Sequence, residues 1–366
     1  MPASNARHFA DRYGASRKIF LDAAKGEGAA LESHQNPHAN GPRDEPLYTD
    51  VARIGPPPGE AARVLVVTSG VHGVEGFAGS GLQVFTLREE LYKAMPRDMA
   101  LVLIHGVNPY GFAHARRVTE GNVDLNRNFL DHDGPYPDDS AYDAVRDIVA
   151  PGDLEPNKVA RDERVRAFVS AHGQRAWQAA VTGGQWRHAD GLFYGGRAPV
   201  WSNTLLRSVC AAHAAGARAV AHLDLHTGLG PYGHGEVIAS ARPDLGGGHV
   251  ADWYGSETTT LLGDTASVSA PLNGVVFDLW TDQAKTSDVT TACLEFGTRD
   301  FRTVLDALAR DNWLYLHGEV DSAQGHEIKS AVTDALYPDE IGWKDMLCVR
   351  MGEVVEQTIT GLGTRG

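Results

Sequence analysis

The chain has 366 residues, of which 42% are hydrophobic and 22% are charged, as in an ordinary globular protein. Its formal net charge of −14 argues against nucleic-acid or anionic-membrane partners, because both attract basic patches. Three widely spaced cysteines, Cys210, Cys293 and Cys348, argue against a disulfide framework and fit a reducing compartment. No apolar run has the length of a signal peptide or membrane span, so we expect a cytoplasmic location. The oligomeric state is left open.

The first third of the chain alternates apolar runs with polar breaks. Residues 8–32 place apolar side chains among charges at helical spacing, which predicts one amphipathic helix. Residues 46–55 predict an edge strand, and residues 64–67 predict a short buried strand before a second helix over 77–92. A buried strand over 99–105 completes a strand–helix–strand unit, so we expect a right-handed crossover in a largely parallel sheet.

The rest of the chain continues this alternation after an irregular stretch. Residues 131–156 are rich in Pro and Asp and predict a surface excursion, whereas 183–201 predict a loop rich in glycine and aromatic residues. Helices are expected over 158–180, 204–214, 304–321 and 343–360, and strands over 217–226, 234–240, 273–280 and 290–296. Because strands alternate with helices, the predicted fold class is α/β.

A histidine and a glutamate lie in the turn that follows the 64–67 strand. Gly70 and Gly73 bend the chain, which brings His72 and Glu75 to the carboxyl end of a strand, where open α/β sheets bind ligands. Imidazole and carboxylate groups both bind zinc, so the pair can hold one ion. The His-x-x-Glu spacing is a weak signal by itself, although it occurs only once in the chain.

Further polar groups follow other expected strands, and together they have the composition of a hydrolytic zinc site. They are Arg116, Arg117, Asn126, Arg127, Asp224, His226 and Glu295. Such a site needs three protein ligands, for which two His and one carboxylate are a known set, a general base, and cations for a developing oxyanion. His72, Glu75 and His226 can supply the ligands, Glu295 the base, and the arginines the cations.

Each of these residues also has an ordinary structural interpretation. His226 can be a hydrogen-bonded histidine at a strand end, and the arginines can be solvated loop charges. Glu295 fits such an interpretation least well, because it lies between apolar neighbours where an unpaired charge costs several kcal/mol.

The order of these motifs resembles the zinc carboxypeptidase superfamily of metallopeptidases, from about Val64 to Phe301. Residues 121–129 are close to its Val-Asp-Leu-Asn-Arg-Asn-Phe segment, and the preceding Asn108-Pro-Tyr-Gly111 matches its usual lead-in. Asp224-Leu-His226 is similar to its second-His strand and Leu294-Glu-Phe-Gly297 to its catalytic-Glu strand. The segments 69–77 and 227–236 look most like a bacterial branch of unassigned function.

The resemblance implies a fold and a cofactor. The fold would be a three-layer α/β/α sandwich around a twisted, mixed, largely parallel sheet. One zinc ion per chain would be bound by His72, Glu75 and His226. Glu295 would activate the attacking water and transfer its proton.

The resemblance also implies substrate-binding residues. Asn126 and Arg127 would bind a substrate carboxylate, Arg127 as a bidentate fork. Arg117, or Arg116 because the register is ambiguous, would stabilise the oxyanion. Asp224 shares strand parity with His226 and has a possible supporting role.

The chain departs from the superfamily in two respects. The interval from Glu75 to His226 is long, which predicts an insertion within residues 131–203 of one domain spanning 1–366, with an N-terminal helical extension over 1–45. The aromatic residue that closes over substrate in the peptidase members has no clear counterpart, and Tyr232 and Tyr254 are the candidates.

The predicted function is that of a zinc-dependent hydrolase of an amide or peptide bond next to a carboxylate, most simply a carboxypeptidase-like exopeptidase. One alternative is an aspartoacylase-like deacylase of small N-acyl amino acids, so the expected partner is a peptide or an N-acyl amino acid. Another alternative is a metal-free binding protein that kept the fold. A nucleotide-binding protein is disfavoured because the chain has no Gly-x-Gly-x-x-Gly turn.

Overall fold

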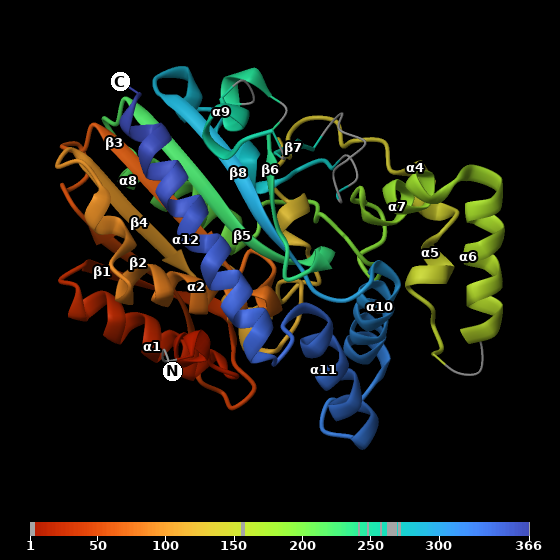
Figure 1. Ribbon diagram of the computed structural model, residues 1–366. Coiled ribbons are helices and arrows are strands. Elements are labelled where there is room, and N and C mark those ends of the chain that lie inside the picture. Colours follow the sequence, from red (N-terminus) through yellow and green to blue (C-terminus); the bar gives the residue numbers. More distant parts are fainter. Residues whose placement is uncertain are drawn as a thin grey trace.

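The computed structural model describes residues 4–154, 158–240, 242–246, 249–256, 258–261, 269 and 272–365. Its centre is an eight-stranded mixed sheet in the order β1-β2-β4-β3-β5-β8-β6-β7 (Figure 1). The strands are β1 (Ala30–Asn40), β2 (Pro46–Ile54), β3 (Arg63–Ser69), β4 (Met99–His105), β5 (Ala219–Tyr232), β6 (Gly235–Ala239), β7 (Thr259–Thr260) and β8 (Asp288–Gly297).

The four central strands β4, β3, β5 and β8 run parallel, so their carboxyl ends meet at one edge. The outer strands β1, β2 and β6 pair in antiparallel fashion with their inner neighbours. Because the parallel strands are covered on both faces, they are nearly continuous runs of buried residues, as in β4, where all positions are buried.

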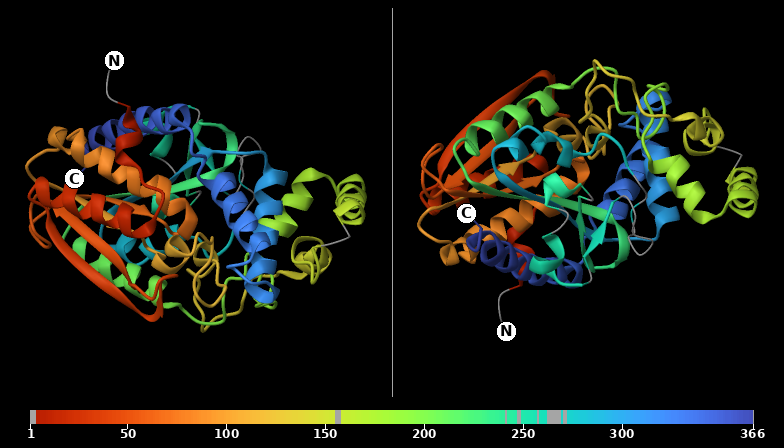
Figure 2. Two further views of the ribbon diagram at one scale, coloured as in Figure 1. Left: turned by 90° about the horizontal axis from the view of Figure 1, so that it is seen from below. Right: turned by 90° about the horizontal axis from the view of Figure 1, so that it is seen from above.

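Helices cover both faces of the sheet, which gives three layers. Helices α1, α2 and α12 lie on one face and α8 on the other (Figures 1 and 2). The predicted α/β sandwich is therefore confirmed. The described helices are α1 (Tyr13–Gly26), α2 (Gly76–Arg88), α3 (Pro109–Ala113), α4 (Ser140–Asp143), α5 (Arg146–Val149), α6 (Lys158–His172), α7 (Gln174–Thr182), α8 (Trp201–His213), α9 (Val250–Tyr254), α10 (Phe301–His317), α11 (Ala323–Leu336) and α12 (Ile341–Gly363).

Strand parity divides the buried side chains into two cores. In β3, Leu65 and Val67 pack with α2 and α12, whereas Val64 and Val66 pack on the opposite face with α8. This second face is the one from which the polar residues at the carboxyl edge project.

Helices α4 to α7 form a lobe that lies beside α10 and apart from the sheet (Figures 1 and 2). The single helix predicted over 158–180 is two helices, because Gly173 adopts a φ of +88° between α6 and α7. That residues 131–203 are an insertion, and that 1–366 is one domain, stay predictions.

Three further expectations about the elements are wrong. The helical extension over 1–45 is helical only in part, since Ala30–Asn40 is an edge strand with an exposed, polar pattern. As a consequence Pro46–Ile54 pairs on both sides and is not an edge. The strand expected over 273–280 is instead a 3-10 helix at Val276–Trp280, which packs its apolar side chains against the α8 face.

Among the described helices, none is both long and apolar enough to cross a bilayer. The cytoplasmic location stays a prediction.

A buried histidine at the end of β4, in contact with α1 and α2, makes the fold sensitive to acid. His105 has no exposed surface, stacks on Phe20 at 4.4 Å, and lies 2.9 Å from the Ser80 hydroxyl through Nε2. Burial lowers the pKa of His105 to about 4. Below its ordinary pKa of about 6.5, the unfolded chain therefore takes up a proton before the folded chain does.

We predict that the free energy of unfolding falls as the pH drops from about 6.5 to about 4, with His105 contributing on the order of 3 kcal/mol. Chemical denaturation across this range measures the effect. The variant His105→Gln should have a shallower pH profile than the parent protein. Parallel profiles for the two proteins would contradict the assignment.

Candidate functional site

The turn after β3 is held against the loop that follows β4. A Cβ atom on Gly73 would lie only 2.0 Å from the carbonyl carbon of Gly111, so this approach requires a glycine. The Gly73 N–H donates to the Arg117 carbonyl at 3.1 Å. His72 and Glu75, on either side of Gly73, are thereby fixed at the carboxyl edge of the sheet.

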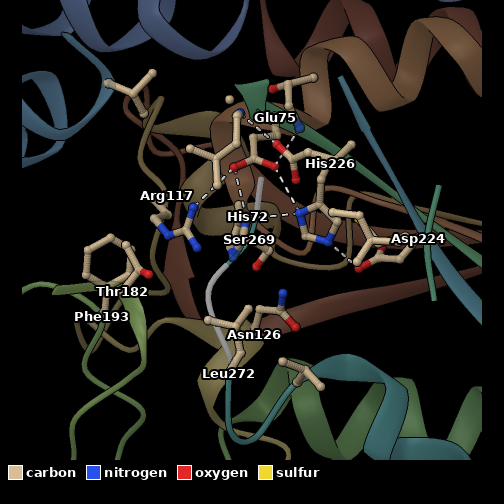
Figure 3. A pocket seen from close by; sticks show the side chains of 18 of the residues that line it. His72, Glu75, Arg117, Asn126, Thr182, Phe193, Asp224, His226, Ser269 and Leu272 are labelled. Carbon is tan, nitrogen blue, oxygen red and sulfur yellow. Dashed lines mark hydrogen bonds and ion pairs between the residues drawn. The ribbon is translucent and has the colours of Figure 1, made fainter. Parts of the chain in front are cut away.

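His72, Glu75 and His226 converge on one point, although β5 supplies His226 from far along the chain (Figure 3). The Glu75 oxygens lie 2.9 Å from His72 Nδ1 and 3.0 Å from His226 Nδ1. The two Nδ1 atoms are 3.1 Å apart. All three residues are buried.

This arrangement fits a small cation. Metal–ligand bonds of about 2.0–2.1 Å at tetrahedral angles separate neighbouring ligand atoms by roughly 3.3 Å, close to the observed spacing. Two imidazoles and one carboxylate are also a donor set that zinc accepts with one position left open. The geometry of His72, Glu75 and His226 is therefore that of a metal site.

Each histidine turns its other ring nitrogen toward a buried aspartate. His226 Nε2 lies 2.5 Å from Asp224 Oδ2, and Asp224 Oδ1 accepts a hydrogen bond of 2.6 Å from the Thr68 hydroxyl. His72 Nε2 lies 3.3 Å from Asp124 Oδ1 without an aligned hydrogen bond. Such partners orient a ligating imidazole and select its tautomer.

Asp224 thus faces His226 as its strand parity predicted, whereas the place of Asp124 was missed. The signal was present, because Asp124 immediately precedes Leu125-Asn126-Arg127 in the segment 121–129 on which the family resemblance rests. Asp124 also caps the 3-10 helix Leu125–Arg127 by accepting the Asn126 N–H at 3.0 Å.

Electrostatic interactions within the group favour the charged forms of Glu75 and His226. Burial opposes ionisation of Glu75, but the interactions with His72 and His226 together hold its pKa below the ordinary value. Burial likewise opposes protonation of His226, yet Asp224 and Glu75 raise its pKa well above 6.5. These surroundings therefore favour a positive charge next to the Glu75 carboxylate. A bound cation can supply that charge.

Glu295 is on β8, where it pairs with His226 of β5, and its side chain lines the same cavity. Its Oε1 accepts the Leu229 N–H at 2.9 Å. Burial, together with the nearby Glu75 carboxylate, raises the pKa of Glu295 to about 7. A carboxyl group in that range can exchange protons near neutral pH.

The two neighbouring arginines have different surroundings. Arg117 lines the cavity, where Nη1 lies 3.4 Å from Glu75 and Nε donates to Asp124 at 2.9 Å (Figure 3). Arg116 points away and donates to Asp311 at 3.0 Å. Of the two arginines, only Arg117 lines the cavity with His72 and Glu75, because the Arg116 side chain forms an ion pair outside it. The choice of Arg117 as the catalytic arginine stays a prediction.

Asn126 and Arg127 both line the cavity. The Asn126 Oδ1 accepts the Val276 N–H at 2.8 Å. Arg127 donates through Nε and Nη2 to the Thr182 carbonyl, at 3.1 and 2.6 Å, and through Nη1 to the Asn126 carbonyl at 2.6 Å. Since a guanidinium has five N–H groups, one remains on each terminal nitrogen. Burial lowers the pKa of Arg127 to about 10, so it stays charged at neutral pH.

Thr182, at the end of α7, and Phe193, in the loop that follows α7, line the cavity without having been predicted (Figure 3). The Thr182 carbonyl accepts from Arg127, and the Phe193 ring contacts the guanidinium groups of Arg117 and Arg127. Phe193 adopts a φ of +54°, which costs a bulky residue on the order of 1–3 kcal/mol. The glycine-rich composition of this loop was the one available signal.

The two tyrosines proposed as closing aromatic residues do not line the cavity. The Tyr232 hydroxyl donates to Glu340 at 2.6 Å and is partly exposed. The buried Tyr254 hydroxyl hydrogen-bonds with Thr358 at 2.8 Å. Tyr254 therefore contacts helix α12, and Tyr232 contacts the residue that precedes this helix.

Together, fold and site define an α/β protein with a buried His–Glu–His group at the carboxyl edge of its sheet. A family model described as "Protein of unknown function (DUF2817)" matches residues 9–350, and the chain belongs to that family. No curated protein matches the chain.

Several solved structures are similar to the chain at low identity. Carboxypeptidase A from Helicoverpa armigera is 12% identical with a TM-score of 0.43, over 96% of this chain and 76% of that one. A metallo-carboxypeptidase from Pseudomonas aeruginosa is 15% identical with a TM-score of 0.39, over 92% and 68%. A protein described as of the succinylglutamate desuccinylase/aspartoacylase family, from Shewanella amazonensis, is 20% identical with a TM-score of 0.35, over 78% and 72%.

We predict that the purified protein binds about one zinc ion per chain, and that the double variant His72→Ala with His226→Ala binds almost none. Elemental analysis of dialysed protein measures the content. The variant His105→Gln is a matched control, because it removes a buried histidine that lies away from the cavity. Equal zinc in all three proteins would contradict the site.

We also predict that Arg116→Ala acts on stability and Arg117→Ala on turnover. Loss of Arg116 removes its buried hydrogen bonds to Asp311 and Asn122, while Asp311 keeps Lys329 as a partner, so the cost should be about 1–3 kcal/mol. The resemblance noted in the sequence implies that Arg117 stabilises an oxyanion, and on that expectation its loss should lower kcat/KM by about 100-fold. Thermal melting and steady-state kinetics separate the two effects. A loss of stability in Arg117→Ala together with a loss of turnover in Arg116→Ala would contradict this assignment.

Proposed function

We propose that the protein is a zinc-dependent hydrolase that cleaves an amide bond next to a carboxylate. The observation that supports this most strongly is the convergence, on one cavity, of a metal-type donor set, a carboxyl group titrating near neutrality and two arginines. Each of these features alone has a structural explanation. Their joint position at the carboxyl edge of the sheet is what a hydrolytic site requires.

His72, Glu75 and His226 would hold the zinc ion, with Asp124 and Asp224 orienting the two imidazoles. Zinc in such a site acts as a Lewis acid toward a carbonyl group and makes water a stronger acid. Because all three residues are buried, they would shield a bound ion from bulk water on the side where they contact it.

Glu295 would act as the general base and then as the acid. Its carboxylate takes a proton from the attacking water and delivers it to the departing amine nitrogen. With a pKa of about 7, Glu295 is ionised in a substantial fraction of molecules at neutral pH and gives the proton up readily. The Leu229 N–H holds the carboxyl group in place during both transfers.

Arg117 and Arg127 would bind the two negative charges of the reaction. Arg117, which faces the cavity beside Glu75, is placed to stabilise the oxyanion that forms on the scissile carbonyl. Arg127 has one N–H left on each terminal nitrogen, which is the fork that binds a carboxylate in bidentate fashion. The Asn126 amide adds a neutral donor at the same wall.

The simplest form of this activity is that of a carboxypeptidase-like exopeptidase acting on a peptide. An aspartoacylase-like deacylase of small N-acyl amino acids requires the same residues. Activity toward C-terminal peptides, compared with activity toward N-acyl amino acids, distinguishes the two substrate classes. A metal-free binding protein would hydrolyse neither class and would contain no zinc.

We predict that Glu295→Gln keeps the zinc and lowers kcat by at least about 100-fold, because the base is lost while the ligands stay. The measurement is kcat on the best substrate of the panel, with zinc content determined on the same preparation. Glu236→Gln is a suitable control, since Glu236 faces Glu295 in the neighbouring strand and does not line the cavity. Turnover of Glu295→Gln at the parental rate would exclude Glu295 as the base.

A further inference from the structure

Phe193 contacts both arginines that line the cavity. The Arg117 guanidinium carbon lies 5.2 Å from the centre of the Phe193 ring, and that of Arg127 lies 5.9 Å from it. Both distances are within the range of about 6 Å over which a cation is attracted to an aromatic face. The ring is only 5% exposed, so water screens these interactions little.

The two cations repel each other, and this repulsion contributes to the lowered pKa of Arg127. An aromatic ring whose negative face is within reach of both guanidinium groups offsets part of the repulsion. The ring thus supports both groups at the cavity, in addition to the hydrogen bonds that each of them makes.

The backbone of Phe193 adopts a conformation that the side chain disfavours. Its φ of +54° is one of five positive values among non-glycine residues in the described part of the chain, and Phe193 is the bulkiest of the five. Such strain persists only where the surrounding structure determines the position, and it is enriched at functional sites.

Hydrogen bonds on both sides of Phe193 determine its position. The Phe193 carbonyl accepts the Gln185 N–H at 3.1 Å, and the next carbonyl, of Tyr194, accepts the Asp124 N–H at 2.7 Å. The Asn128 side chain donates to the Gly195 carbonyl at 2.7 Å. The loop is thus bonded directly to the segment that carries Arg127.

We propose that Phe193 is a positioning residue that keeps Arg117 and Arg127 directed into the cavity for a carboxylate-bearing ligand. This rests on the proposed function, in which Arg127 binds the carboxylate and Arg117 the oxyanion. Because Phe193 belongs to the loop between α7 and α8, this loop would affect which ligands the site prefers.

The competing explanation is that Phe193 only fills space in the core. Phe193→Leu distinguishes core filling from the positioning role, because leucine keeps an apolar side chain but has no aromatic face. Phe193→Tyr restores the ring. Phe129→Leu is the matched control, since Phe129 is 1% exposed, lies 5.4 Å from the guanidinium of Arg207, and does not line the cavity.

The experiment uses zinc-loaded protein in the Glu295→Gln background, so that ligands are bound and not consumed. Calorimetry gives the Kd of N-acetyl-leucine and of its primary amide, and their ratio measures the preference for a carboxylate. In Phe193→Leu the preference for the acid over the amide should fall roughly tenfold, whereas Phe193→Tyr should keep most of it. In Phe129→Leu only the thermal stability should fall.

An unchanged preference in Phe193→Leu overturns the proposal. If that variant does not fold, Phe193→Met, which also lacks the ring, carries the same expectation. A parent protein that binds acid and amide equally would overturn the carboxylate site itself, and this proposal with it. A parent that prefers the acid, with an equal preference in Phe193→Leu, overturns only the role of Phe193.

Discussion

The buried carboxylate of Glu75 is the interaction on which the rest of the site depends. It is 1% exposed, and an isolated carboxylate in that position would cost several kcal/mol. Its oxygens instead face His72 and His226 and accept the Thr227 N–H at 3.0 Å. Because these partners come from the turn after β3 and the end of β5, the carboxylate can be buried only when both strands are in register.

Strand parity explains how the supporting residues come to surround that carboxylate. In β5, His222, Asp224 and His226 alternate with apolar residues and project from the α8 face. In the neighbouring β8, Glu295 pairs directly with His226, so its side chain emerges on the same face. A shift of one residue in β5 or in β8 would turn the groups that this strand carries toward the opposite core.

The elements that could be predicted from the sequence are those whose signals are local. The buried runs of β3, β4, β5 and β8, and the polar residues at their ends, are visible as patterns of a few residues. Strand β1 was missed because its outward-facing residues are polar, and its pairing with β2 involves no apolar pattern. The choice between Arg116 and Arg117 depended on Asp311, which is remote in sequence and therefore offers no local signal.

Sequence patterns were least informative for the end of α7 and the loop that follows it. These segments position Arg127 and so restrict how a ligand can bind. Arg127 reaches its position only because Gly184 leaves room for it: a Cβ atom there would lie 2.7 Å from Arg127 Cδ. The Thr182 carbonyl accepts from Nε and Nη2 of the guanidinium and the Asn126 carbonyl from Nη1, which leaves one N–H on each terminal nitrogen. His72, Glu75 and His226 come from the turn after β3 and from β5, whereas these contacts come from the end of α7 and the loop that follows it. The proposed metal binding and the proposed carboxylate recognition would therefore depend on separate parts of the chain, so that changes in the loop would alter the ligand preference while the metal site stays intact.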